Sequence, residues 1–119
     1  MEDPTAWIYK DRDKEDRIRH ERERVAHGFS AFDWWNFNSY LDWVIIQGLE
    51  MFKNGAGHPV YEEVQTMDDW RRILDKMIEG FKAHDRLMND YDPSTSKDDR
   101  AVWEEGRTLF IKFYDSLWD

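Results

Sequence analysis

The strongest constraint on the fold is a long amphipathic stripe in the second half of the chain. Thr66 is followed three residues later by Asp69, which is the spacing of a capping box that starts a helix. Apolar side chains then recur at steps of three and four residues, at Trp70, Ile73, Leu74, Met77, Ile78 and Phe81, with His84 next in the series. This period places them on one face of a helix. The sequence therefore predicts a helix over residues 67–90 that buries this face against other elements.

Three further segments are predicted to be helical. Residues 38–53 carry a second apolar stripe that ends before Gly55, and residues 97–117 carry a third. Residues 5–27 form a highly charged helical segment that ends at Gly28. The sequence contains no alternating strand pattern and no internal repeat. The predicted class is an all-α, compact helical bundle of about four helices, the usual packing for helices of this length joined by short loops.

One hydrophobic core is expected to join the last three helices. At 119 residues the chain has the size of one domain that buries roughly two thirds of its unfolded surface. The predicted organisation is a charged N-terminal helical arm at residues 1–27 and a helical domain at residues 28–119. The expected core residues are Leu41, Ile45, Leu49, Ile73, Leu74, Met77, Ile78, Phe81, Leu109, Phe110 and Phe113.

The charged N-terminal segment is poor in large apolar side chains. Trp7, Ile8, Ile18 and Val25 are its members of this kind, too few to bury much of a helix against its own domain. One interpretation is a solvated arm. The other is an arm that docks on another subunit through Trp7, Ile8 and Ile18. The second interpretation predicts a homo-oligomer held through the N-terminal helix.

Composition excludes several classes of function. The chain has no cysteine, which removes disulfides and thiolate metal sites and is typical of a reducing compartment. A net charge of -9 disfavours binding to duplex nucleic acid, which relies on Lys and Arg. The longest uninterrupted apolar stretch, residues 43–46, is far shorter than the ~20 residues of a membrane span, and the N-terminus is charged, unlike a signal peptide. We therefore expect a cytoplasmic protein without a membrane partner.

Common enzyme motifs are missing from the sequence. It has no phosphate-binding glycine loop, no H-E-x-x-H zinc motif and no G-x-S-x-G nucleophile elbow. None of its four histidines forms a pair spaced four residues apart, the spacing that would place two ligands on one helix face. We therefore predict no catalytic residue, no metal ligand and no cofactor.

A magnesium-dependent nucleotide hydrolase is one alternative. Small all-α enzymes that resemble the MazG-like pyrophosphohydrolases hold magnesium with an E-x-x-E pair on one helix and a second acidic pair on a facing helix. In this chain Asp75 and Glu79 lie four residues apart on one predicted helix, and Asp42 or Glu50 would be the facing carboxylate. This alternative requires the carboxylates to converge on one ion.

Aromatic and basic side chains near the predicted loops form a candidate ligand site. An indole face can stack on a planar ring, and a guanidinium beside a helix N-terminus attracts a phosphate. Such a pair suits one nucleotide better than a polymer. The residues predicted to bind the ligand are Trp34, Trp35, Tyr61, Trp70, Arg71 and Arg72. The alternative is that the aromatics belong to the core and that the arginines pair with Asp68 or Asp75.

Several stretches from Gly28 onward also carry a family resemblance. They are Gly28-Phe29-Ser30, Asp33 with Trp35 and Asn36, Tyr40-Leu41, Val44-Ile45-Ile46, Leu49 with Phe52-Lys53, residues 70–78 with Gly80-Phe81, and residues 113–119. In this combination the chain resembles an uncharacterised family of small tailed-bacteriophage proteins. The resemblance covers about three quarters of the chain and leaves out the charged segment before Gly28. It implies a viral origin and work in the host bacterial cytoplasm, and it implies no activity.

The expected function follows from that resemblance and from the missing enzyme motifs. Small phage proteins without catalytic motifs often bind a component of the host, an analogy at the level of class. We therefore expect a non-enzymatic accessory protein that acts in counter-defence by sequestering a small nucleotide immune signal. The alternatives are an inhibitor that binds a host protein and the MazG-like hydrolase. The expected partner is a small nucleotide-like ligand or a host protein.

Overall fold

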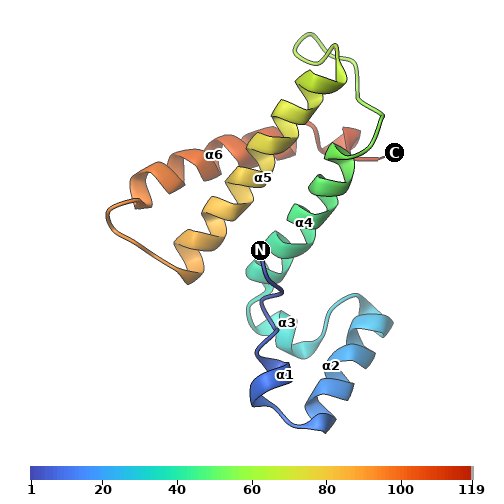
Figure 1. Cartoon of the computed structure of the whole chain (residues 1–119), viewed down its shortest axis with the longest axis vertical. Helices are drawn as coiled ribbons and strands as arrows, with labels where there is room; N and C mark the ends of the chain where they lie inside the picture. The colour runs from blue at the N-terminus through green and yellow to red at the C-terminus, as the bar shows by residue number, and fades with distance from the viewer. Residues whose placement is uncertain (119) are drawn as a thin grey trace. The chain divides into compact units, whose positions relative to one another are not determined.

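The computed structural model describes residues 1–118 and is all-α, which confirms the predicted class (Figure 1). Over these residues it has no β-strand, and Tyr61 and Val64 form an isolated bridge. The chain divides into two compact units, unit 1 (Met1–Trp43) and unit 2 (Val44–Asp119). In order, the helices are α1 (Ile8–Asp11), α2 (Lys14–His27), α3 (Ala31–Trp35), α4 (Phe37–Lys53), α5 (Met67–Asn89), α6 (Ser96–Lys112) and the 3-10 helix η1 (Tyr114–Ser116).

The charged segment of unit 1 is two helices and not the single helix predicted over residues 5–27. Helix α1 ends at Asp11, and α2 begins after Asp13, whose carboxylate accepts a hydrogen bond of 2.9 Å from the backbone N–H of Asp16. Asp is a strong N-cap residue, so it starts a new helix where the sequence pattern also allowed a continuous one. Gly28 ends α2 with φ of 85°, the left-handed conformation expected of a glycine at this position.

The first 27 residues are tied to the following helix of unit 1. Ile8 is fully buried, and the Trp7 ring packs on Phe32 and stacks on Trp35 with ring centroids 5.9 and 6.5 Å apart. Two residues of the stripe expected to meet another subunit are therefore engaged within the chain itself, while Ile18 is exposed. The boundary between the two compact units falls after Trp43. The predicted boundary between the charged arm and the helical domain lay after residue 27.

Unit 2 is built on a hairpin of two long helices, α5 and α6, which run in opposite directions (Figure 1). The predicted capping box of Thr66 and Asp69 is present at the start of α5. Where the helices cross, Gly80 and Gly106 meet: a Cβ on Gly80 would lie 2.7 Å from the Gly106 Cα, and one on Gly106 would lie 2.6 Å from the Gly80 Cα. The backbones themselves are in contact, so neither position has space for a side chain.

The core of unit 2 contains most of the residues predicted for it. Those fully or nearly buried are Leu49, Leu74, Met77, Ile78, Phe81 and Phe113, and Ile45, Ile73, Leu109 and Phe110 pack against them half-buried. The prediction that Leu41 belongs to this core was wrong, because its side chain is 40 % exposed and it lies in the part of α4 that belongs to unit 1. Ile46, Val64 and Trp70 are core residues that the prediction lacked.

The other helix ends lie close to their predicted positions. Helices α4 and α5 match residues 38–53 and 67–90 within one residue at each end. Helix α6 ends at Lys112, before the predicted residue 117, and η1 continues the chain. Thr95 is the N-cap residue of α6, and its side chain makes no capping hydrogen bond. Among residues 1–118, no helix combines the length and apolar character needed to cross a bilayer.

Candidate functional site

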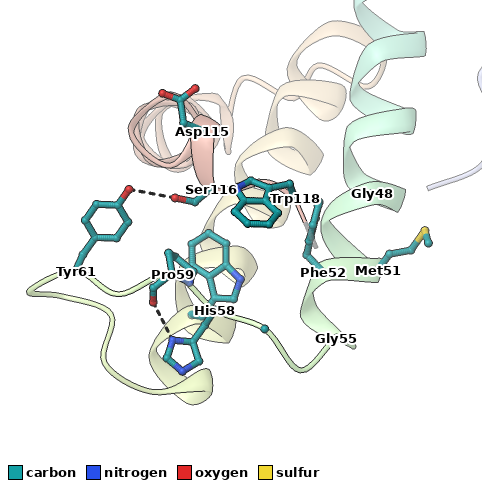
Figure 2. A pocket seen from close by; sticks show the side chains of 12 residues that line it. Gly48, Met51, Phe52, Gly55, His58, Pro59, Tyr61, Asp115, Ser116 and Trp118 are labelled. Carbon is teal, nitrogen blue, oxygen red and sulfur yellow. Dashed lines mark hydrogen bonds between the residues drawn. The ribbon is translucent and has the colours of Figure 1, made fainter.

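A cavity of about 640 Å³ opens in unit 2 beside the C-terminal end of α4 (Figure 2). Three parts of the chain supply its walls: the last turns of α4 with the loop that follows, Trp70 of α5, and the segment around η1. The lining residues are Gly48, Met51, Phe52, Gly55, Gly57, His58, Pro59, Tyr61, Trp70, Asp115, Ser116 and Trp118. This is the size of cavity that holds a small organic molecule.

The loop after α4 is held by backbone contacts and one buried anchor. The N–H of Gly55 donates to the carbonyl of Phe52 at 3.1 Å as the helix ends. Tyr61 and Val64 then exchange two backbone hydrogen bonds of 3.1 and 3.2 Å, and the Val64 side chain is fully buried in the core. The loop therefore keeps a defined course and presents His58, Pro59 and Tyr61 to the cavity.

The aromatic wall of the cavity is continuous with the core. The ring of Phe113 makes edge-to-face contacts with Trp70 at 5.5 Å and with Tyr61 at 5.3 Å. Trp70 and Phe113 are each 1 % exposed, whereas Trp118 is 77 % exposed at the mouth of the cavity. Edge-to-face pairs add stability beyond the area that they bury. Because Trp70 and Phe113 are almost fully buried, the rings of this wall that a planar ligand can reach are those of Tyr61 and Trp118.

The polar side chains of the cavity bond to neighbours within it. The hydroxyls of Tyr61 and Ser116 form a hydrogen bond of 3.2 Å, which is the dashed line between these two side chains in Figure 2. The Nδ1 of His58 lies 2.8 Å from the Pro59 carbonyl, which can only accept, so Nδ1 carries the proton of this hydrogen bond. The carboxylate of Asp115 points away from the other labelled side chains in Figure 2. The hydroxyls and the imidazole are therefore the groups able to orient a ligand.

Gly48 is a glycine that packing does not require. It lies inside α4 and lines the cavity, and a Cβ built on it would meet no atom within 4 Å. Glycine in a helix interior costs about 1 kcal/mol relative to alanine. Gly80 and Gly106 have a structural reason to be glycine, because a Cβ there would strike a backbone. At Gly48 the consequence of a larger side chain is a smaller cavity.

Two of the six predicted ligand-binding residues, Tyr61 and Trp70, line this cavity. Trp70 is also a core residue, as the alternative interpretation held. Arg71 and Arg72 form ion pairs with Asp68 and Asp69 on their own helix, and the Arg71 Nε also donates to the Lys53 carbonyl at 3.2 Å. Both arginines are thus engaged within the protein.

The other two predicted residues, Trp34 and Trp35, belong to unit 1. They are 67 % and 61 % exposed on α3. The side chains missed by the prediction include Met51, His58, Ser116 and Trp118. One sequence signal did exist, which is a glycine at residue 48 within an apolar helical stripe.

Unit 1 contains a second cluster, built around the guanidinium of Arg24. Arg24 donates to both carboxylate oxygens of Asp33 at 2.7 and 2.8 Å and to those of Asp3 at 2.7 and 3.0 Å. Its Cζ also lies 5.4 Å from the Tyr40 ring and 5.0 Å from the Trp43 ring. The hydrogen bond with Asp33 raises the pKa of Arg24 against the opposing effect of burial. One side chain thus joins the N-terminus, α2, α3 and the start of α4.

The two carboxyls of this cluster stay ionised. Burial by itself raises the pKa of Asp33, but hydrogen bonds from Arg24 and from the Ser30 backbone N–H outweigh it, so the pKa is lowered. Asp3 shows the same balance, with burial outweighed by hydrogen bonds from Arg24 and Thr5. Ser30 and Asp33 also form the capping box of α3.

His20 completes the cluster as a buried, neutral imidazole. The Thr5 hydroxyl donates to Asp3 at 2.8 Å, so it accepts from the His20 Nε2 at 3.3 Å. The Nδ1 therefore accepts from the Ser30 hydroxyl at 2.6 Å. Burial, and then the nearby charge of Arg24, lowers the pKa of His20. His20, Ser30 and Thr5 are all buried, so this network belongs to the interior of unit 1.

Two of the carboxylates named for the hydrolase alternative, Asp75 and Glu79, form ion pairs with lysines. Asp75 pairs with Lys53 at 2.7 Å and Glu79 with Lys82 at 3.8 Å. Asp42 is buried in unit 1. In the part of the chain that the structure describes, no group of three or more His, Asp or Glu side chains is placed to hold a metal ion. The convergence required by this alternative is thus lacking over residues 1–118.

Comparisons with protein-family models, with curated proteins and with solved structures find no match for this chain. The resemblance to a family of tailed-bacteriophage proteins therefore stays a prediction. The cavity of unit 2 is the feature from which a function can be inferred, and the Arg24 cluster stabilises unit 1.

Proposed function

We propose that this chain is a non-catalytic binding protein that holds a small planar molecule in the cavity of unit 2. The observation that carries the proposal is a cavity of about 640 Å³ with aromatic walls, kept open by a helix-interior glycine, Gly48, that packing does not require. Cavities of ~300–1,000 Å³ with apolar walls and few polar groups are typical of small-molecule sites.

The hydrogen bonds in the cavity favour binding over catalysis. A nucleophilic hydroxyl is normally activated by a base within hydrogen-bond reach. The Ser116 hydroxyl instead lies at the Tyr61 hydroxyl, and the His58 Nδ1 is engaged by a loop carbonyl. These groups are arranged to orient a ligand, which would leave the protein chemically unchanged.

The biological role follows if the resemblance to phage proteins holds. A viral protein that encloses a small host molecule without transforming it lowers the free concentration of that molecule, which is counter-defence by sequestration. The nucleotide immune signal expected from the sequence is one candidate for the ligand. It would need a cation for its phosphates, and the nearby Lys53 is paired with Asp75.

A substitution that fills the cavity tests the proposal. In Gly48→Phe the new side chain enters open space on α4, so the helix keeps its packing and gains helix propensity while the cavity loses volume. The matched control is Gly48→Ala, which adds one methyl group. Both variants and the wild type are screened by thermal shift with nucleosides, with cyclic and ADP-ribose-derived nucleotides, and with indole compounds.

The expected result is a ligand that stabilises the wild type and Gly48→Ala but not Gly48→Phe. At a concentration of 100 times Kd, binding adds about 2.7 kcal/mol to the free energy of unfolding. That shifts Tm by roughly 10 °C for a domain of this size. A ligand that stabilises Gly48→Phe as strongly as the wild type would show that it binds outside the cavity.

Heat release of the bound compound then separates the alternatives. Intact compound supports sequestration, and a hydrolysed product supports the hydrolase. A panel in which nothing shifts Tm would contradict small-molecule binding. It would leave the inhibitor of a host protein, for which the exposed indoles of Trp34 and Trp35 on α3 offer apolar contact area.

A further inference from the structure

We infer that the cavity of unit 2 selects planar ligands that are uncharged or cationic and rejects the same ring system when it carries an anionic group. The inference rests on the proposed function and specifies the class of ligand. It runs against the nucleotide expected from the sequence, whose phosphates are anionic.

The walls of the cavity offer hydrogen-bond acceptors to a ligand. Among residues 1–118, those that line the cavity include no lysine and no arginine. The Nδ1 of His58 is engaged by the Pro59 carbonyl, and the hydroxyls of Tyr61 and Ser116 can each accept a hydrogen bond. These acceptors suit a ligand with N–H or O–H donors and offer no counter-charge to an anion.

Two cations, Lys53 and Arg71, adjoin lining residues of the cavity in the sequence, and both are already paired. Lys53 ends α4 and pairs with Asp75 at 2.7 Å. Arg71 follows the lining residue Trp70, and its guanidinium bonds to Asp68 at 3.3 Å and to the Lys53 carbonyl at 3.2 Å. Recruiting either cation to a bound anion would break an ion pair. The net charge of the chain, -9, further opposes the approach of an anion.

The aromatic lining of the cavity disfavours an anion more than a cation. Burying an ionised group without a partner is unfavourable, and an anion in this cavity would lose water without gaining a cation. A cation can gain from the lining, because the exposed rings of Trp118 and Tyr61 have faces with negative electrostatic potential. Rings with a positive or neutral substituent therefore retain favourable contacts that an anionic one lacks.

A matched set of three indoles tests the selectivity. Tryptophol is neutral, tryptamine is cationic and indole-3-propionate is anionic near pH 7.5, and all three carry the same ring. Each is titrated into the full chain by isothermal calorimetry. We expect tryptophol and tryptamine to bind with a Kd at least tenfold lower than that of indole-3-propionate. Equal or tighter binding of the anion would overturn the inference.

A substitution at Met51 tests the cause of the selectivity. Met51 lines the cavity from α4 and is 76 % exposed, so a longer polar side chain is accommodated there. Met51→Arg supplies the missing cation and should tighten binding of indole-3-propionate about tenfold while weakening tryptamine. Met51→Gln, the neutral control, should leave the order of the three ligands unchanged. No response to Met51→Arg would contradict the charge argument.

The outcomes also separate this inference from the proposed function. If all three indoles bind alike and Gly48→Phe abolishes them all, the cavity is a binding site and the charge selectivity is wrong. If none of the three binds, both the selectivity and the planar-ligand site are contradicted. Selective binding that disappears in Gly48→Phe supports both.

Discussion

Each of the two units is stabilised internally by a different kind of interaction. Unit 2 has an apolar core that includes Leu74, Met77 and Ile78, and its two long helices touch backbone to backbone at Gly80 and Gly106. Unit 1 has few large buried apolar side chains and is organised around the charged side chain of Arg24. Unit 2 therefore depends on shape and volume, whereas unit 1 depends on charge and hydrogen-bond geometry.

The comparison shows how a highly charged segment can fold without a large core. Arg24 has a planar guanidinium that binds two carboxylates at once, each through two hydrogen bonds. Each such bond joins segments that have few apolar contacts to offer. Unit 1 is therefore sensitive to substitution of either partner, because a buried charge that loses its partner destabilises the fold strongly. The units should therefore respond differently to the same kinds of perturbation.

The largest effect is expected from Arg24→Leu. The Asp33 side chain is fully buried, so this substitution leaves its carboxylate without a cation. We expect a loss of about 3–5 kcal/mol in the free energy of unfolding of unit 1. Hydrogen exchange should show faster exchange in α2 and α3 than in α5. Arg22→Leu, at an exposed position of the same helix, is the control and should change stability by less than about 0.5 kcal/mol.

The central role of Arg24 in unit 1 would be contradicted if Arg24→Leu lowered the free energy of unfolding no more than Arg22→Leu does. It would also be contradicted if protection were lost equally in α5 and α6. The first result would mean that apolar contacts hold unit 1, and the second that the two units unfold as one.

A somewhat smaller effect is expected from Gly106→Ala. The added methyl carbon would lie 2.6 Å from the Gly80 Cα and 2.8 Å from the Lys76 carbonyl oxygen, so the two helices must separate. Overpacking of this kind costs about 1–3 kcal/mol, which urea denaturation of unit 2 can measure. Gly48→Ala is the matched control, since it makes the same change in a helix without any contact within 4 Å. It should stabilise the protein by about 1 kcal/mol.

Equal effects of the two glycine substitutions would contradict the contrast between a closed contact and an open cavity. Stabilisation by Gly106→Ala would show that α5 and α6 can move apart at no cost. Destabilisation by Gly48→Ala would show that the space beside α4 is filled.

The smallest effect is expected from a mild change of pH. The pKa of His20 is lowered by burial and by Arg24, so the unfolded chain binds a proton more readily than the folded one. Stability should therefore fall as pH drops below about 6.5, the ordinary value for histidine. The lowered pKa values of Asp3 and Asp33 affect stability at lower pH. Their contribution to the free energy of unfolding is present above pH about 3.8, the ordinary pKa of the group, and is lost as the pH falls further.

Hydrogen exchange at pH 7.5 and 5.5, corrected for the intrinsic rate, checks this prediction. Protection in α2 and α3 should decrease while that in α5 and α6 is retained. His20→Gln lacks the titrating group and should remove the difference between the two pH values. A loss spread evenly over both units would argue against a pH response located at His20.

Features that depend on near neighbours in the sequence were predicted well. The predicted capping box of Thr66 with Asp69 is present, because it needs only two residues that lie three positions apart. The apolar face of α5 is buried as its period indicated. The break before α2 was missed although Asp13 is a good cap, because charged residues spaced four apart also support an unbroken helix.

The candidate site was predicted only in part. Tyr61 and Trp70 were chosen as aromatic residues near a loop, and both line the cavity. Ser116 and Trp118 were not, because they reach it from the end of the chain through the turn at η1. Contacts between residues more than fifty positions apart leave no local pattern. Arg71 and Arg72 were chosen for their charge, which acidic neighbours on the same helix already balance.

The sequence by itself determined the class of fold, the position of the long helices and the acidic, cysteine-free character of the chain. These properties follow from composition and from the three- and four-residue spacing of apolar side chains, which act locally. The tertiary structure decided which arginine of α2 became the centre of unit 1 and which glycines became contacts. Gly48, Gly80 and Gly106 look alike in a sequence, because glycine has no side chain to carry a periodic signal. Only the approach of another helix, or its absence, makes one a contact and another the wall of a cavity.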